Sequence, residues 1–247
     1  MIGHVKRAGT RCSVLQPGTP ARAGRNDEDG PVIPECDVTP TIDVDYASLR
    51  VLTAYQVVEG FAVVRDYQPL IDVGWDDARE CVEAEARWLD RAAKAPTAEE
   101  FDQILAGAAQ EEAPDDFDWL FRGLDVGVAG LSLVLSAACY ATCFSCRTHP
   151  SRAGDHMPQV IMAAEPQRVR VLARHAERAG CGVENMEGGL VCVYSASVRH
   201  LHALAQAMLD ARAKLEELPP PAWLPRVQEY LSADDTNEFE WTDDEIG

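Results

Sequence analysis

Apolar and polar residues follow helical and strand-like periods in turn along residues 123–217, and their order predicts the secondary structure of this segment. The pattern predicts a helix at about 125–138, an extended piece ending at Cys146, a strand at 160–163, a helix at 167–179, a hairpin of 181–186 and 190–194, and a helix at 197–218. The order α-β-loop-β-α-β-β-α is typical of a two-layer α/β sandwich. We therefore expect an α/β (α+β) fold with this sandwich as its C-terminal module.

Three further regions flank the module. Residues 1–45 are rich in glycine, proline and charged side chains and contain few apolar ones, which predicts a disordered leader. Residues 46–122 predict a mainly helical, acidic region. Residues 218–247 predict a proline linker with a short amphipathic piece and a disordered acidic tail.

Within the acidic region, two capping-box spacings predict where helices begin. Asp77 and Thr97 each stand three positions before a glutamate at the start of a run with helical periodicity. Residues 50–64 fit either a hairpin or a helix, because several valines there suit both periods.

Residues 126–146 form a run of 21 residues without a charge, long enough to span a bilayer. The run contains glycines, serines, a threonine and three cysteines, which favours a buried helix that passes into a strand over a membrane span. No targeting segment is recognised, and the eight cysteines are unevenly spaced, so we expect reduced thiols and a cytoplasmic location.

The net charge of −19 lies outside the predicted module. Residues 123–217 carry nine acidic and nine basic residues and are neutral. An acidic chain repels phosphate backbones, which argues against nonspecific nucleic-acid binding. The arginines of 147–199 predict a solvated helix surface, and a local anion-binding face is the alternative.

The candidate chemistry lies directly after the apolar run. Cys139, Cys143, Cys146 and His149 fall within eleven residues, and His156 follows. Cys143 and Cys146 have the spacing of a chelate turn, and two of Cys139, His149 and His156 would complete a zinc site. Alternatively, Cys146 is a nucleophile with His149 as its base and Arg147 as a neighbouring positive charge.

The same stretch resembles the wybutosine-tRNA methyltransferase family over about residues 123–200. The resemblance rests on a helix followed by Thr142, Ser145-Cys146 and Arg147, and then on a strand pair that begins Gly180-Cys-Gly-Val-Glu-Asn. It implies that the loop after the helix is the functional site. It also implies, as an alternative function, methylation of a modified guanosine in tRNA with S-adenosylmethionine as cofactor.

These observations predict a protein that binds a small ligand, an anionic group or zinc through the loop Ser145–His156. The candidate ligand-binding residues are Thr142, Ser145, Cys146, Arg147, His149 and His156. Two alternatives remain open, an enzyme of the methyltransferase or cysteine–histidine type, and an interaction protein. In the last, Phe239 and Trp241 stand among acidic residues of the tail and would dock into a basic groove of a protein partner.

Overall fold

The sheet of the computed structural model has five strands in the order β1-β4-β5-β3-β2. The structure describes residues 33–61, 70–111, 120–148, 157–233 and 239–242. The strands are β1 (Ile42–Asp43), β2 (Ala141–Cys146), β3 (Gln159–Ala163), β4 (Cys181–Met186) and β5 (Leu190–Ser195). β1 pairs with β4 in parallel, and the other three pairings are antiparallel.

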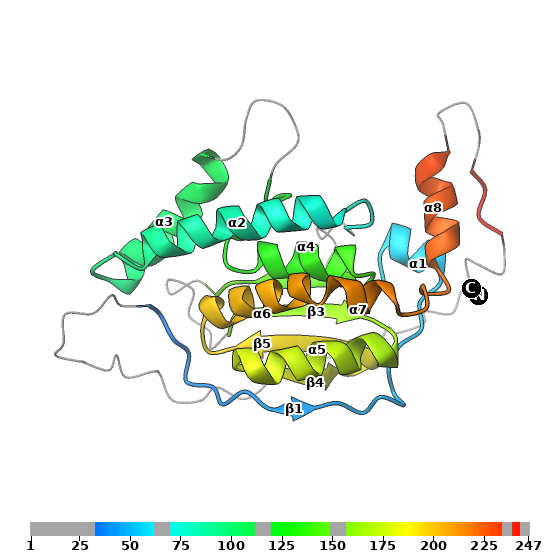
Figure 1. Cartoon of the computed structure of the whole chain (residues 1–247), viewed down its shortest axis with the longest axis horizontal. Helices are drawn as coiled ribbons and strands as arrows, with labels where there is room; N and C mark the ends of the chain where they lie inside the picture. Colours follow the sequence, from blue (N-terminus) through cyan, green and yellow to red (C-terminus); the bar gives the residue numbers. More distant parts are fainter. Residues whose placement is uncertain (1–32, 62–69, 112–119, 149–156, 234–238, 243–247) are drawn as a thin grey trace, which may run out of the picture.

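The helices are α1 (Ala54–Glu59), α2 (Trp75–Ala92), α3 (Ala98–Glu111), α4 (Ala129–Ala137), α5 (Pro166–Ala179), α6 (Val198–Asp210), α7 (Arg212–Glu216) and α8 (Leu224–Ser232). α4, α5 and α6 lie over one face of the sheet (Figure 1). α2 packs on α4 and α6, and α3 packs on α2. α1 and α8 pack on each other at one end of the molecule (Figure 1). The expected mixed α/β fold is confirmed.

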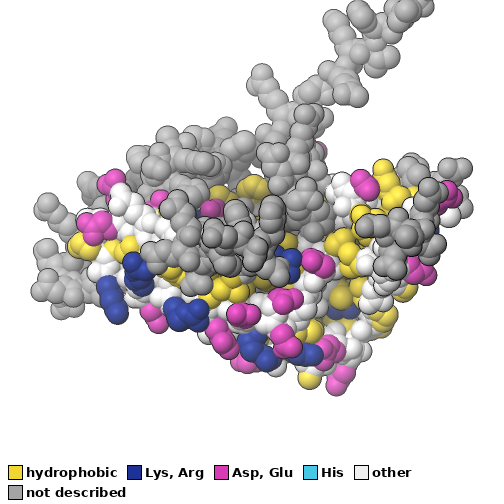
Figure 2. All heavy atoms as spheres, turned by 90° about the horizontal axis from the view of Figure 1, so that it is seen from above, with side chains coloured by type: hydrophobic (Ala, Val, Ile, Leu, Met, Phe, Trp, Pro, Cys, Tyr) yellow, Lys and Arg dark blue, Asp and Glu magenta, His cyan; other side chains and the backbone are white. Residues whose placement is uncertain are grey.

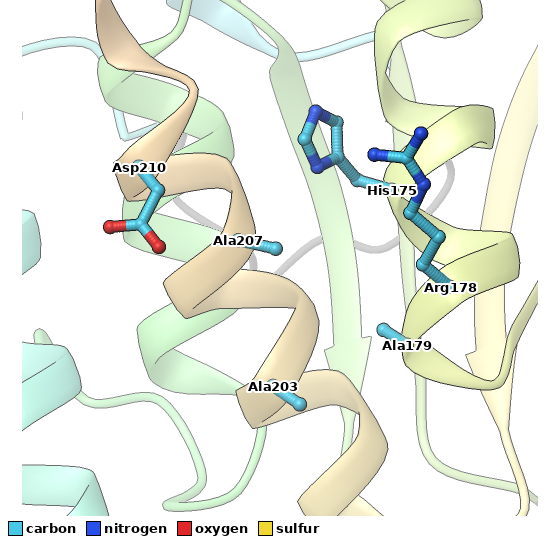
Figure 3. Close-up of a pocket in the computed structure, with 6 residues that line it drawn as sticks. All are labelled: His175, Arg178, Ala179, Ala203, Ala207 and Asp210. Carbon is cyan, nitrogen blue, oxygen red and sulfur yellow. The ribbon is translucent and has the colours of Figure 1, made fainter.

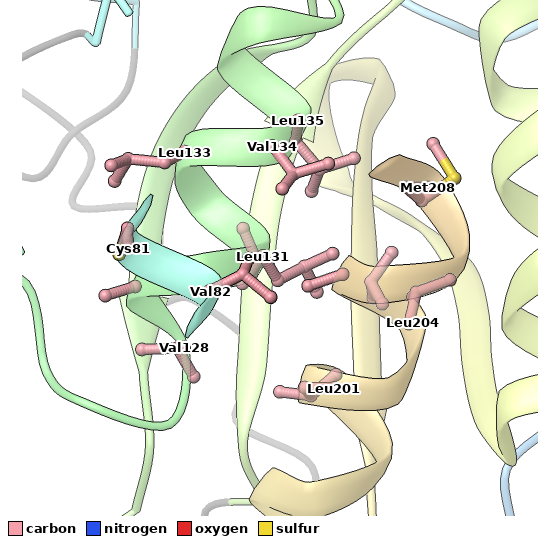
Figure 4. Packing of buried hydrophobic residues seen from close by; sticks show 14 of the residues in the cluster. Cys81, Val82, Val128, Leu131, Leu133, Val134, Leu135, Leu201, Leu204 and Met208 are labelled. Carbon is pink, nitrogen blue, oxygen red and sulfur yellow. The ribbon is translucent and has the colours of Figure 1, made fainter. Parts of the chain in front are cut away.

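One hydrophobic core joins the helical region to the sheet. Figure 4 shows its central part, where side chains from α2, α4 and α6 meet: Cys81, Val82, Leu131, Leu133, Val134, Leu135, Leu201, Leu204 and Met208. Complete burial of a leucine or valine side chain contributes about 1.5–3 kcal/mol. The acidic helices α2 and α3 therefore share the core of the sandwich.

The long apolar run divides into a buried helix and a strand, as expected. α4 and β2 are joined by a turn in which Cys139 has a left-handed backbone, with φ 61°. The amide of Tyr140 donates to the carbonyl of Leu135, and that of Cys139 to the carbonyl of Ser136, both at 2.9 Å. This is a Schellman ending, which lets the chain reverse directly into β2. Among the described residues, no helix has the length and apolar character needed to cross a membrane.

The end of the predicted leader is structured. β1 adds to the edge of the sheet, where the amide of Val183 donates to the carbonyl of Thr41 at 2.8 Å. The sequence pattern does not reveal this strand, because backbone pairing holds it and core burial does not, and Ile42 remains 39% exposed.

Helix boundaries differ from the expectation in two places. α2 begins at Trp75, ahead of Asp77, because the Asp77 carboxylate accepts the amide of Gly74 from inside the first turn at 2.9 Å. The helix expected at 197–218 is interrupted at Ala211, between α6 and α7. The predicted cap at Thr97 is confirmed, since its hydroxyl accepts the amide of Glu100 at 3.1 Å. In the ambiguous segment 50–64, α1 is helical, and residues 62–69 lie outside the described residues.

Candidate functional site

The face of the sheet opposite α4, α5 and α6 carries polar and aromatic side chains in two rows across the strands. Val160 and Val193 pair with each other and are buried in the core, so their neighbours along each strand point to the opposite face. The first row is Cys146, Gln159, Tyr194 and Gly182, and the second is Phe144, Ile161, Cys192 and Glu184. We call these residues, together with Cys143, the thiol face.

Tyr194 lies across the neighbouring strand in the first row. Gly182 has no side chain, and a Cβ atom there would overlap the Tyr194 ring. The Tyr194 hydroxyl accepts the amide of Thr41 at 3.3 Å and lies 3.1 Å from the Thr41 hydroxyl. The ring is thus held between the sheet and the segment that leads into β1.

Cys143 and Cys192 are buried thiols on this face. Cys143 lies at an irregularity in β2, and its Sγ donates to the carbonyl of Ile161 at 3.4 Å. The Sγ of Cys192 donates to Oε1 of Gln159 at 3.3 Å. Burial raises the pKa of each thiol to about 12, although the positive charge of Arg50 opposes the rise at Cys143. Both thiols are therefore protonated at neutral pH, which disfavours nucleophilic attack and metal binding.

Cys146 is only half-buried and lies where β2 ends. Its Sγ accepts the amide of Thr148 at 3.4 Å. Thr148 has φ 72°, an unusual backbone conformation for a β-branched residue. Such local strain is concentrated at functional sites in proteins. The end of β2 is therefore the part of the thiol face that most resembles a binding site.

Arg147 fixes this turn to the helices. Its side chain is buried, and Nη2 lies 3.0 Å from Oδ1 of Asp102 on α3. The side chains of the adjacent residues Cys146 and Arg147 point to opposite faces of the sheet. The Arg147–Asp102 ion pair therefore holds the turn on the helix side, while Cys146 lies on the thiol face. Arg147 thus positions Cys146.

The structure separates the predicted ligand-binding residues. Thr142 is buried, with its hydroxyl 3.2 Å from that of Ser136 on α4, and it joins helix to strand. Ser145 pairs with the core residue Val160 and lies on the helix side of the sheet. Of the six candidates only Cys146 lies on the thiol face among the described residues. His149 and His156 lie outside the described residues.

Among the described residues, the predicted cysteine ligands do not form a zinc site. Across the part of the chain that the structure describes, no three or more histidine, cysteine or acidic side chains are placed to hold a metal ion. Cys139 ends α4, Cys143 lies at the strand irregularity, and Cys146 ends β2, so the three thiols occupy different positions along the turn and strand. Burial also raises the pKa of the Cys139 thiol.

Sequence reasoning missed Gln159, Glu184, Cys192 and Tyr194 as site residues. Burial and the neighbouring Asp43 carboxylate raise the pKa of Glu184. The alternation within 190–194 could have placed Cys192 and Tyr194 on one face. Only the register of β2 against β3 brings Gln159 beside Cys146.

A separate polar cluster lies buried among the helices. Oε1 of Glu85 on α2 accepts the amides of Gly127 at 2.7 Å and Gly130 at 3.1 Å, at the start of α4. Its Oε2 lies 2.9 Å from Nδ1 of His202 on α6. A carboxylate suits the positive end of a helix dipole. The cluster joins three helices and is structural.

A shallow groove runs between α5 and α6, with a volume of about 370 Å³. In Figure 3, Ala179 faces Ala203 and Ala207 across it, and His175 and Arg178 extend from α5. Burial, followed by the charges of Arg178 and Lys214, lowers the pKa of His175. The groove is lined by charges of both signs, because Asp210 also borders it.

The arginines of 147–199 are largely paired within the fold. Arg147, Arg168 and Arg199 form ion pairs with Asp102, Glu165 and Asp90. Arg170 lies over the ring of Tyr46, 4.6 Å from its centre. On the surface shown in Figure 2, basic and acidic side chains are interspersed. Arg170, Arg174 and Arg178 are exposed on α5, as expected for a solvated helix surface, whereas Arg147 and Arg168 are buried.

Compared with protein-family models, with curated proteins and with solved structures, the chain gives no match. The resemblance of residues 123–200 to the wybutosine-tRNA methyltransferase family therefore stays a prediction.

Proposed function

We propose that this protein binds a small ligand on the thiol face, at the end of β2. The observation that carries the proposal is the first cross-strand row, in which Cys146, Gln159 and Tyr194 are direct neighbours. Cys146 and Gln159 are half-buried, so part of each side chain remains accessible to a ligand. The predicted loop Ser145–His156 begins at this point of the sheet.

Near Cys146 the surrounding side chains favour an uncharged, flat ligand over an anion, while the positive charge of Arg50 acts at Cys143. The guanidinium of Arg147 is bound to Asp102 and points away from this face. Glu184 and Asp43 are carboxylates at its far edge and oppose a negative charge. Phe144 is half-buried and offers an aromatic ring, and the half-buried Gln159 amide offers hydrogen-bond donors.

Zinc is less favoured than an uncharged ligand, because the nearby thiols are protonated and hydrogen-bonded. Two of the nearby thiols, Cys143 and Cys192, have a pKa raised to about 12 and would have to lose a proton to bind it. Each thiol also donates a hydrogen bond to an oxygen, which metal binding would break.

The test is a thermal-shift screen of uncharged aromatic fragments, with S-adenosylmethionine, zinc and inorganic phosphate as separate probes. A binding fragment is expected to raise the Tm of the wild-type protein and to slow alkylation of Cys146 by iodoacetamide. The Gln159→Leu variant should lose both effects. Gln206→Leu, at an exposed position of α6, is the matched control and should keep them.

Two results would contradict the proposal. One is a fragment shift of equal size in Gln159→Leu and wild type, which would place binding elsewhere. The other is a Tm increase with zinc or phosphate alone, which would restore the metal or anion alternative. A shift with S-adenosylmethionine that depends on Cys146 would favour methyl transfer.

A further inference from the structure

Residues 239–242 lie against α1 and α8 through a cluster of aromatic rings. The ring of Trp241 stacks on that of Tyr230, with centres 5.8 Å apart, and meets the edge of Tyr55 at 5.6 Å. Phe239 meets Tyr230 edge-on at 5.3 Å and Trp241 at 4.7 Å. Tyr55 belongs to α1 and Tyr230 to α8.

Arg226 on α8 contacts both aromatic residues of this segment and the backbone between them. Its guanidinium carbon lies 4.2 Å from the centre of the Phe239 ring and 5.8 Å from that of Trp241. Its Nη2 donates to the carbonyl of Glu240 at 2.6 Å. Glu229 holds the other end of the guanidinium at 2.8 Å. We call Tyr55, Arg226 and Tyr230 the aromatic platform.

The platform rests on its own hydrophobic cluster. Val57 of α1 and Val227 of α8 are buried there, together with Ala141 and Ala163 of the sheet. Of the docked segment, only Trp241 packs against this cluster. α1 and α8 therefore pack on each other and on this cluster without Phe239.

The docked segment leaves part of the platform exposed to solvent. Tyr230 is 36% exposed with the segment in place, so the rings are not sealed in a core. Five residues separate the segment from Ala233, and such a tether gives an intramolecular ligand an effective concentration of about millimolar order. A segment on another chain would meet the same rings and the same guanidinium.

We propose that the aromatic platform is a docking site for acidic protein segments that carry two aromatic residues separated by one residue. Phe239-Glu240-Trp241 occupies this site within the chain. Cation–π contacts and a charge-assisted hydrogen bond hold such a segment on Arg226, whose positive charge favours acidic residues in it. Docking of the tail aromatics into a groove of another protein stays a prediction, and the present proposal does not rest on the thiol face.

The test uses the full-length double variant Phe239→Ala, Trp241→Ala, which vacates the platform. The probe is a fluorescein-labelled peptide with the sequence of residues 237–242, Asn-Glu-Phe-Glu-Trp-Thr. Fluorescence anisotropy should show saturable binding to the double variant, and binding at least about tenfold weaker to wild type, whose platform is occupied. Adding Arg226→Gln to the double variant should weaken binding by about tenfold.

Two controls test whether binding of the probe is specific to the aromatic platform. Adding Arg212→Gln, which removes a half-buried arginine of α7 that lies over the Trp75 ring, should leave binding unchanged. A peptide with alanine at both aromatic positions should not bind. The single variant Phe239→Ala keeps Trp241 on the hydrophobic cluster and should bind the probe with intermediate affinity. It tests the proposal even if α8 unfolds in the double variant. Equal binding to wild type and double variant, or no saturable binding to either variant, would overturn the proposal.

Discussion

The two faces of the sheet differ in how deeply the side chains of the same strands are buried. On the helix side, Val160, Met162 and Val193 are completely buried, and the nearby Glu85 carboxylate has hydrogen-bond partners at both oxygens. On the thiol face, Cys146 and Gln159 are neighbours and only half-buried. Because side chains alternate along a strand, one set of residues can stabilise the fold while the other carries accessible chemistry. Variants on the helix side should therefore change mainly the free energy of unfolding, and variants on the thiol face should also change ligand binding.

The largest effect is expected from Glu85→Ala on the helix side. The change leaves the amides of Gly127 and Gly130 and the ring of His202 without their acceptor inside the core. Each buried polar group left without its hydrogen-bond partner costs about 1–3 kcal/mol. Urea unfolding should show this decrease in the free energy of unfolding.

Glu83→Ala is the matched control, because Glu83 is exposed on the same helix and should change stability by less than about 0.5 kcal/mol. Glu85→Gln separates hydrogen bonding from charge, since an amide oxygen still accepts both glycine amides. Similar losses for alanine at positions 83 and 85 would show that the buried cluster does not stabilise the fold.

A smaller effect is expected from Gly182→Ala on the thiol face. The added methyl group overlaps the Tyr194 ring and forces it off β4. Overpacking of this kind costs about 1–3 kcal/mol, and fragment binding should be lost with it. The control Gly107→Ala lies in α3 with no atom within 4 Å of the added carbon, so it should gain about 0.5–1 kcal/mol. Fragment binding that survives in Gly182→Ala would show that Tyr194 does not form part of the site.

The buried thiols predict a loss of stability at alkaline pH. The folded-state pKa of Cys143, Cys181 and Cys192 is raised to about 12 from an ordinary 9.0, so the unfolded chain loses these protons first. Their contribution is complete below about pH 9 and is lost as the pH rises toward 12, at up to about 1.4 kcal/mol per pH unit for each thiol.

Urea unfolding at about pH 8 and about pH 10 measures this slope. Cys192→Ala removes one thiol from the thiol face and should make the slope shallower, and Cys181→Ala does the same on the helix side. An unchanged slope in both variants would mean that these thiols titrate alike in the folded and unfolded chain.

The order of helices and strands could be predicted from the sequence because it depends on local periodicity. The hairpin of β4 and β5 and the helix ending at Gly180 are examples. The candidate site could not be predicted, because it depends on the register of strands distant in sequence. Arg147 was expected to face a ligand, and its position is decided by Asp102 on α3, 45 positions away in the chain. β1 has no apolar pattern and was invisible for that reason.

The smallest effect is expected at Cys139, which belongs to neither face. Its left-handed backbone costs an L-residue about 1 kcal/mol relative to glycine, while glycine gains entropy in the unfolded chain. Cys139→Gly should therefore raise the free energy of unfolding by about 0.5 kcal/mol. The matched change Ala138→Gly, at a residue with φ −85°, should lower it, because alanine is not strained there. If Cys139→Gly destabilises the protein instead, the burial of the Cys139 side chain outweighs the backbone strain, and Cys139 belongs with the core of the helix side.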